Sequence, residues 1–296
     1  MIKSLQRHWL SIALLSPSLI LLGVFVYGFI GLNINISLTD EVGLNNNDAN
    51  FIGLENYIKL LDDPRFHIDI WNTIVFSFSF IGITLALGLG LAILIDSKIP
   101  AEGFFRSVYL LPMAVSFIVT GVVWRWLMNP ATGERTSGLN LLFDVVGLDF
   151  LINQWHLTPT WGMLGIAVPA IWQMSGYTMA LFLAGLRGIP EEVKEAARMD
   201  GASELGIYRR VILPMLKPVA LSAVVILAHI SLKVFDLIIA IAGKQIALDV
   251  PAIYMWQTTF DAYNFARGAT LATYILISVA IFVIPYLIVT NRKEKV

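Results

Sequence analysis

The sequence has no cysteine and few charged side chains, and both shortages limit what the protein can do. Without thiols it forms no disulfides, no thiolate metal sites and no cysteine nucleophile. Charged residues make up 14% of the chain, whereas a soluble domain has about 25%. The formal net charge is only −1, so no electrostatic argument favours nucleic acid as a partner. With 57% hydrophobic residues and a mean hydropathy of +0.75, the chain is predicted to be an all-α polytopic membrane protein.

Six apolar runs are long enough to cross a hydrocarbon core about 30 Å thick as helices of about 20 residues. The predicted spans are Trp9–Ile36, Trp71–Ile95, Phe104–Leu127, Trp161–Leu186, Val219–Ala242 and Gly268–Val289. The first run exceeds the apolar core of a secretory signal, which has about 7–15 residues, so we expect it to be retained. No linker or internal repeat divides the chain, which predicts one transmembrane domain over residues 1–296.

The distribution of Lys and Arg predicts the orientation, because positive residues accumulate on the cytoplasmic side. If the amino terminus lies inside, the inside segments hold 13 Lys and Arg residues and the outside segments hold six. The inside set includes Lys3, Lys98, Arg187, Arg210 and Lys295. Both termini are therefore expected to be cytoplasmic, together with the polar stretch between the fourth and fifth spans.

That stretch, Gly188–Pro214, is the longest polar and basic interruption between the apolar runs. Pro190 suits a first helical position, where its missing N–H would have no partner anyway. Gly201 tolerates the positive φ of a turn, and Ser203 can cap a second helix that Pro214 ends. The sequence thus predicts a compact helix-turn-helix just outside the membrane.

The spacing within this stretch resembles the EAA loop of bacterial and archaeal ABC importer permeases. Glu195-Ala196-Ala197 is followed after three residues by Gly201, and after nine more by Val211-x-Leu213-Pro214. Val211 stands where that family usually has Ile. Leu183–Pro190 and Trp124–Pro130 look like the carbohydrate-uptake branch, the maltose- and glycerol-phosphate-type sugar permeases. The resemblance covers essentially the whole chain.

The resemblance implies the transmembrane permease subunit of an ATP-driven, binding-protein-dependent importer for a sugar, oligosaccharide or sugar-like solute. It implies a second homologous permease, two ATPase subunits that hold ATP and Mg, and an extracytoplasmic solute-binding protein, all at a bacterial or archaeal cytoplasmic membrane. The residues implied in ATPase coupling are Glu195, Ala196, Ala197, Asp200 and Gly201. The chain itself is expected to be no enzyme and to hold no cofactor, since Gly243-Lys244 lacks the rest of a phosphate loop. Its four histidines lack metal-ligand spacing.

Polar and aromatic residues inside the spans are candidates for the solute pathway, because sugars need flat apolar surfaces and hydrogen-bonding partners. The candidates are Trp172, Gln173 and Tyr177 in the fourth span, Lys233 and Asp236 in the fifth, and Asn72 in the second. Lys233 and Asp236 are three residues apart, so they are expected to share a helix face and to pair. Each of these residues could equally serve helix packing, and the Lys233–Asp236 pair could fix an outer gate.

Three alternatives stay open at this point. A self-contained ion-coupled secondary transporter would need a coupling-ion site and usually shows repeat symmetry, and neither is visible. An intramembrane enzyme would need a recognisable nucleophile or acid-base pair, which Lys233 and Asp236 alone do not supply. The polar loop could also be a solvated segment without a partner.

Overall fold

A computed structural model of the chain describes residues 2–43, 49–97, 99–131, 133–158 and 161–293. Lys98 and Lys295, which support the predicted orientation, lie outside the described residues. The described residues form helices without a strand, which confirms the all-α class. Contacts divide the chain into two compact units, Met1–Asp63 with Tyr254–Leu276, and Pro64–Ile253 with Ile277–Val296.

The first unit joins the predicted first span to the start of the last. Its elements are α1 (Ile2–Leu22), the π-helical turn η1 (Gly23–Gly28), α2 (Phe29–Ser37), α3 (Glu55–Leu61), the end of α14 (Pro251–Trp256), η8 (Gln257–Asp261) and the first part of α15 (Phe265–Lys293). Asn33 on α2 donates hydrogen bonds to the Ala269 carbonyl at 3.1 Å and to Thr273 Oγ1 at 2.9 Å. Asp63 accepts hydrogen bonds from Tyr254 and Arg267. These contacts hold α2 and α3 close to α15 and α14.

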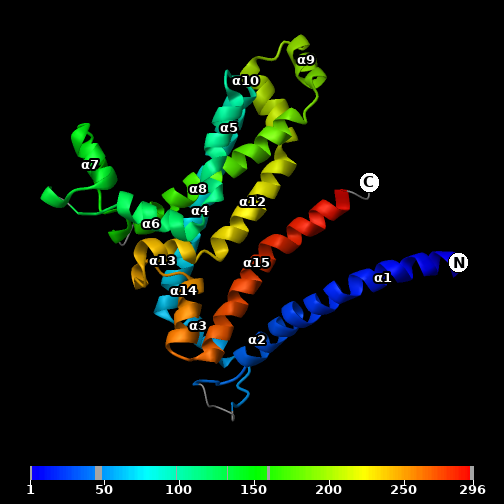
Figure 1. The fold of residues 1–296 in the computed structure, drawn as a ribbon, viewed down its shortest axis with the longest axis vertical. Coiled ribbons are helices and arrows are strands. Elements are labelled where there is room, and N and C mark those ends of the chain that lie inside the picture. Colours follow the sequence, from blue (N-terminus) through cyan, green and yellow to red (C-terminus); the bar gives the residue numbers. More distant parts are fainter. Residues whose placement is uncertain (1, 44–48, 98, 132, 159–160, 294–296) are drawn as a thin grey trace. The chain divides into compact units, whose positions relative to one another are not determined.

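The second unit contains the other predicted spans and the polar loop (Figure 1). Its elements in chain order are α4 (Pro64–Asp96), α5 (Glu102–Leu110), η2 (Leu111–Ala114), α6 (Phe117–Leu127), η3 (Gly133–Arg135), α7 (Gly138–Val145), η4 (Asp149–Leu151), η5 (Trp155–Leu157), α8 (Gly162–Arg187), α9 (Glu191–Met199), α10 (Glu204–Ile207), η6 (Tyr208–Ile212), α11 (Leu213–Met215), α12 (Lys217–Leu232), α13 (Asp236–Ala242) and η7 (Ile246–Leu248). The start of α14 and the end of α15 complete it.

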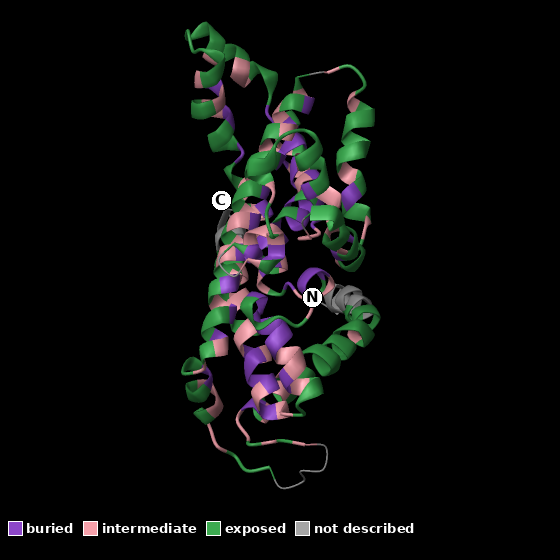
Figure 2. Cartoon of the chain, turned by 90° about the vertical axis from the view of Figure 1, so that its left-hand side faces the viewer, coloured by how far each residue is buried: buried purple, intermediate pink, exposed green. Residues whose placement is uncertain are grey.

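Helix α8 is the centre of this unit. Within its most apolar window 72% of the residues are buried, against 28% for α4. Helix α4 packs on α8 through a stripe of small and aromatic residues that includes Phe80, Thr84, Gly88 and Ala92, and such buried stripes are purple in Figure 2. A Cβ added at Gly88 would lie 2.6 Å from Thr178 Cγ2. Small residues therefore allow the two helices to approach closely, as is common between membrane helices.

Helix α4 is 33 residues long and is held by ion pairs at both ends. At its start, Arg65 Nε donates to Asp249 Oδ2 at 2.7 Å, and Asp249 is almost fully buried. At its end, Asp96 lies 3.6 Å from the Arg187 guanidinium at the end of α8. The helix begins at Pro64, so it extends well before the predicted start of the second span.

Two pairs of helices in this unit are bent against each other. The described helices include four that are long and apolar enough to cross a membrane, and six spans result only if each bent pair counts as one. The third span turns by 99° between Ala114 and Phe117. The second bend, of 62° at Leu216, lies where the polar loop enters α12, just before the predicted start of the fifth span. In the third span Pro112 lacks an N–H, and Ser116 starts α6 by accepting a hydrogen bond from the Val119 N–H at 3.4 Å.

The prediction of one continuous helix over Val219–Ala242 is wrong. Helix α12 ends at Leu232, and α13 begins at Asp236 after Phe235 takes a non-helical conformation (φ −140°, ψ −63°). The break lets α13 pack on α6, where a Cβ at Gly121 would lie 2.5 Å from Ala240 Cβ. The apolar composition of the run could not predict this change of direction.

Gly176 on α8 supplies a direct test of the packing in the second unit. A Cβ at this position would lie 1.8 Å from the Tyr109 carbonyl oxygen on α5. The Gly176→Ala variant must therefore move the α5 backbone away from the α8 backbone. We expect a loss of about 1–3 kcal/mol of stability, as for other overpacked interiors. The measurement is thermal unfolding of the purified protein in detergent. Gly90→Ala on α4 is the control, because nothing lies within 4 Å of its added Cβ. Equal melting temperatures for both variants would refute the close approach.

Candidate functional site

The polar loop forms the predicted helix-turn-helix. Helix α9 begins at Glu191 with Pro190 as its N-cap residue, so the helix starts one residue later than predicted. At its end the Ala202 N–H donates to the Ala197 carbonyl at 3.1 Å, and Gly201 has a φ of +79°. Such a reversal at a helix end favours glycine. Ser203 then caps α10 by accepting a hydrogen bond from the Gly206 N–H at 3.3 Å.

The prediction that Pro214 ends the second helix is wrong. The helix continues through the π-helical turn Tyr208–Ile212 and α11 to Met215, and the bend follows at Leu216. Pro214 has no N–H to donate, so the wider π-helical turn before it accommodates the missing backbone bond.

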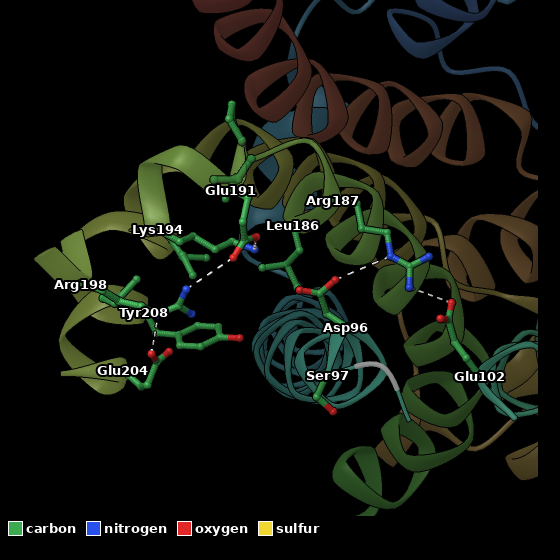
Figure 3. Close-up of a pocket in the computed structure, with 14 residues that line it drawn as sticks. Asp96, Ser97, Glu102, Leu186, Arg187, Glu191, Lys194, Arg198, Glu204 and Tyr208 are labelled. Atoms are coloured by element: carbon green, nitrogen blue, oxygen red, sulfur yellow. Dashed lines mark hydrogen bonds and ion pairs between the residues drawn. The ribbon is translucent and has the colours of Figure 1, made fainter. Parts of the chain in front are cut away.

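Ion pairs tie α9 to α10 across the turn (Figure 3). Glu191 contacts Lys194 Nζ at 3.1 Å and Arg198 at 3.5 Å. Arg198 Nε donates to Glu204 Oε1 at 2.8 Å. The hydrogen bond and charge of Lys194 lower the pKa of Glu191, so its carboxylate is ionised at neutral pH. The network fixes the angle between the two short helices.

A second group of ion pairs connects the membrane helices at the base of this loop. Arg187 Nη2 donates to Glu102 Oε1 at 2.7 Å, and its Nε lies 3.6 Å from Asp96 Oδ1. One guanidinium therefore joins the end of α8 to the end of α4 and the start of α5. Figure 3 shows both groups of ion pairs around one cavity of about 740 Å³.

The two faces of α9 differ in burial. Val193 and Ala197 pack against the buried cluster that includes Ile207 and Leu216, so Ala197, one of the residues implied in ATPase coupling, faces inward. Ala196 is exposed. We define the loop surface as the exposed residues Glu195, Ala196, Met199, Asp200, Gly201 and Leu205.

The loop surface carries two large apolar side chains. Met199 is 89% exposed and Leu205 is 80% exposed. Large apolar side chains exposed on a polar loop mark it as a candidate for a protein contact. Leu205 was not predicted from the sequence, although its place directly after the Ser203 cap, on the exposed start of a helix, could have indicated it.

The pathway candidates of the fourth span divide into exposed and buried residues. Trp172 is 42% exposed, and its ring contacts Trp124 edge to face with centroids 5.8 Å apart. Tyr177 is partly exposed. Gln173 is 3% exposed and donates from Nε2 to the Val115 carbonyl at 2.6 Å, in the bend of the third span. Trp172 and Tyr177 thus have exposed surface, whereas the Gln173 amide nitrogen is engaged with backbone.

The other pathway candidates are not brought together. Asn72 is buried and donates to the carbonyls of Ala247 at 3.0 Å and Asp249 at 2.9 Å, which anchors the segment before α14. Lys233 and Asp236 are both exposed. The prediction that they share a helix face is wrong, because the helix is interrupted between α12 and α13. No ion pair joins these two described residues.

Comparisons with known proteins agree on one family. Residues 82–293 match the family model described as binding-protein-dependent transport system inner membrane component. A probable ABC transporter permease of Pyrococcus horikoshii is 43% identical and covers 96% of each chain. The xylose/arabinose import permease of Haloferax volcanii is 38% identical over 90% of this chain and 84% of its own. One solved structure is a bacterial alginate ABC transporter in complex with an alginate-bound periplasmic protein. A chain of that structure has the same fold, with a TM-score of 0.79 and 22% sequence identity. The match covers 100% of this chain and 98% of that chain.

Replacement of Gln173 by Leu separates a structural role from a role in solute contact. The change leaves the Val115 carbonyl without its side-chain donor, so we expect a loss of about 1–3 kcal/mol in stability. Thermal unfolding checks this, with Gln154→Leu as the control because that exposed side chain makes no hydrogen bond to the described part of the chain. Normal stability combined with a defect for particular sugars would show instead that Gln173 contacts the solute.

Proposed function

Since the chain belongs to the family of binding-protein-dependent transport system inner membrane components, we propose that it is the membrane-spanning subunit of an ATP-driven importer of a sugar, oligosaccharide or sugar-like solute. The import of xylose and arabinose by the Haloferax volcanii relative supports the solute class. The single observation that carries the proposal is the loop surface, whose exposed Met199 and Leu205 stand on a base fixed by ion pairs.

The loop surface is the ATPase-docking site in this proposal. Its coupling segment comprises Glu195, Ala196, Ala197, Asp200 and Gly201. Of these, Ala197 packs inward against the buried cluster and supports the exposed residues. The partner ATPases supply ATP and Mg, and this chain supplies no cofactor. In this proposal a movement of α9 reaches α8 through the short connection that ends at Pro190, and the ion pairs of Arg187 pass it on to α4 and α5.

The remaining partners follow from the same proposal. An extracytoplasmic binding protein delivers the solute, as the description of the family indicates. None of the first span's most apolar window is buried within this chain, so its apolar side chains are available to lipid and to a second, homologous permease. The greater number of Lys and Arg residues on the loop side supports a cytoplasmic position for that loop and for both termini, in a bacterium or archaeon.

Trp172 and Tyr177 line the solute pathway in this proposal. Their exposed aromatic surfaces suit the apolar face of a sugar ring. Lys233 and Asp236 contribute separately, at the break between α12 and α13. Asn72 and Gln173 shape the pathway by fixing the neighbouring backbone.

The energy source of uptake tests the proposed function. In cells or right-side-out vesicles, sugar uptake should continue when ion gradients are dissipated and should stop when ATP is depleted. The test separates this importer from the ion-coupled secondary transporter. Uptake that follows the ion gradient and ignores ATP would refute the proposal.

Gly201→Asp tests the docking surface. The variant places a carboxylate where the partner is expected to exclude water, at a cost of about 2 kcal/mol or more, which corresponds to a roughly thirtyfold loss of ATPase association. Co-purification of the ATPase and transport-coupled ATP hydrolysis are the measurements. Gly201→Asn is the matched control, since Asn tolerates the same positive φ and has nearly the same size without the charge. Wild-type association and uptake in the Asp variant would show that the turn makes no such contact.

A further inference from the structure

A cavity of about 510 Å³ lies at the carboxyl end of α6, and its lining includes none of the loop-surface residues or proposed pathway residues. Helices α6 and α13 pack together at this place (Figure 1). The lining comes from α6, the segment after it, η5, the end of α13 and Gln245. It comprises Val122, Arg125, Trp126, Asn129, Pro130, His156, Leu157, Ile241 and Gln245.

The cavity carries one uncompensated positive charge. Arg125 is the charged residue of the lining, which contains no carboxylate, and it forms no ion pair with the described part of the chain. His156 is 6% exposed, and its Nδ1 is buried without a hydrogen-bond partner among the described residues. Burial and the charge of Arg125 lower the pKa of His156, so the imidazole is neutral at neutral pH. The cavity therefore favours an anion.

The remaining lining suits a ligand with a polar head and an apolar body. The side chains of Trp126 and Gln245 are exposed and make no hydrogen bond to described residues, so the indole N–H and the amide are available as donors. Val122, Leu157 and Ile241 provide an aliphatic wall. Ile118, Val122 and Trp126 are spaced four residues apart on α6 and are 54%, 57% and 65% exposed, which makes an apolar strip that leads into the cavity.

We propose that this cavity binds the phosphate of an anionic phospholipid, with Arg125 as the cation and Trp126 and Gln245 as neutral donors. A guanidinium matches a phosphate with two parallel hydrogen bonds. A soluble phosphate ester would satisfy Arg125 equally well, but it would leave the apolar strip of α6 uncovered. A phospholipid covers that strip with an acyl chain. Tryptophan at the end of a membrane helix is also typical of the membrane-water interface.

Lipid titration of the purified full chain in detergent tests the proposal. We compare phosphatidylglycerol, phosphatidylcholine and glycerol 3-phosphate, measuring thermal unfolding and the lipid retained in native mass spectrometry. Phosphatidylglycerol should raise the melting temperature more than phosphatidylcholine does, and glycerol 3-phosphate should have little effect. Arg125→Gln should weaken phosphatidylglycerol binding about tenfold, because a hydrogen bond between charged groups is lost. Arg125→Lys should retain part of the binding.

Arg135→Gln is the matched control, since Arg135 is exposed on η3 and does not line the cavity. The melting temperature in phosphatidylcholine shows whether each variant is folded. If glycerol 3-phosphate matches phosphatidylglycerol in the wild type and fails in Arg125→Gln, the anion site stands and its ligand is a soluble ester. Equal effects of the two lipids, or an undiminished phosphatidylglycerol effect in Arg125→Gln, would overturn the proposal.

Discussion

The structure of the second unit depends on how closely other helices approach α8. Gly176 lies against the Tyr109 carbonyl, and Gly88 of α4 lies against Thr178. Next to these contacts Gln173 donates to the Val115 carbonyl, in the bend where the third span leaves its helical path. A backbone group in an apolar environment needs a partner, and α8 supplies one at that bend. Neighbouring residues of α8 therefore provide both the close helix packing and the hydrogen-bond donor that the bent backbone needs.

The same helix carries the connection to the loop surface. Arg187 ends α8 and contacts both Asp96 and Glu102, while the next residues begin the turn into α9. Partly exposed ion pairs of this kind contribute little to stability, typically below about 1 kcal/mol each. Their value here is directional. The pairs of Arg198 restrict how α9 can rotate against α10. The pairs of Arg187 fix the end of α8, where the loop begins, against α4 and α5. The exposed Met199 and Leu205 are thereby presented in a defined orientation.

Local signals in the sequence predicted much of this arrangement. Pro190, Gly201 and Ser203 each act within a few residues, so the helix-turn-helix could be derived from them. The bends could not, because hydropathy records composition and not backbone direction. The hydrogen-bond partners of Asn72 and Gln173 could not be predicted for a related reason. Their partners are 175 and 58 residues away along the chain, so no spacing rule relates them.

Helix α4 has a mechanical property that follows from its length and its attachments. Its 33 residues extend for about 50 Å, well beyond a hydrocarbon core of about 30 Å. The Gly88 contact with α8 divides this rod unequally, about 12 Å from Asp96 and about 35 Å from Arg65. The longer part, toward Arg65, is held by hydrogen bonds from Arg65 and Asn72 to Asp249, in the segment before α14. We therefore expect that segment and the start of α4 to move together whenever the helix tilts.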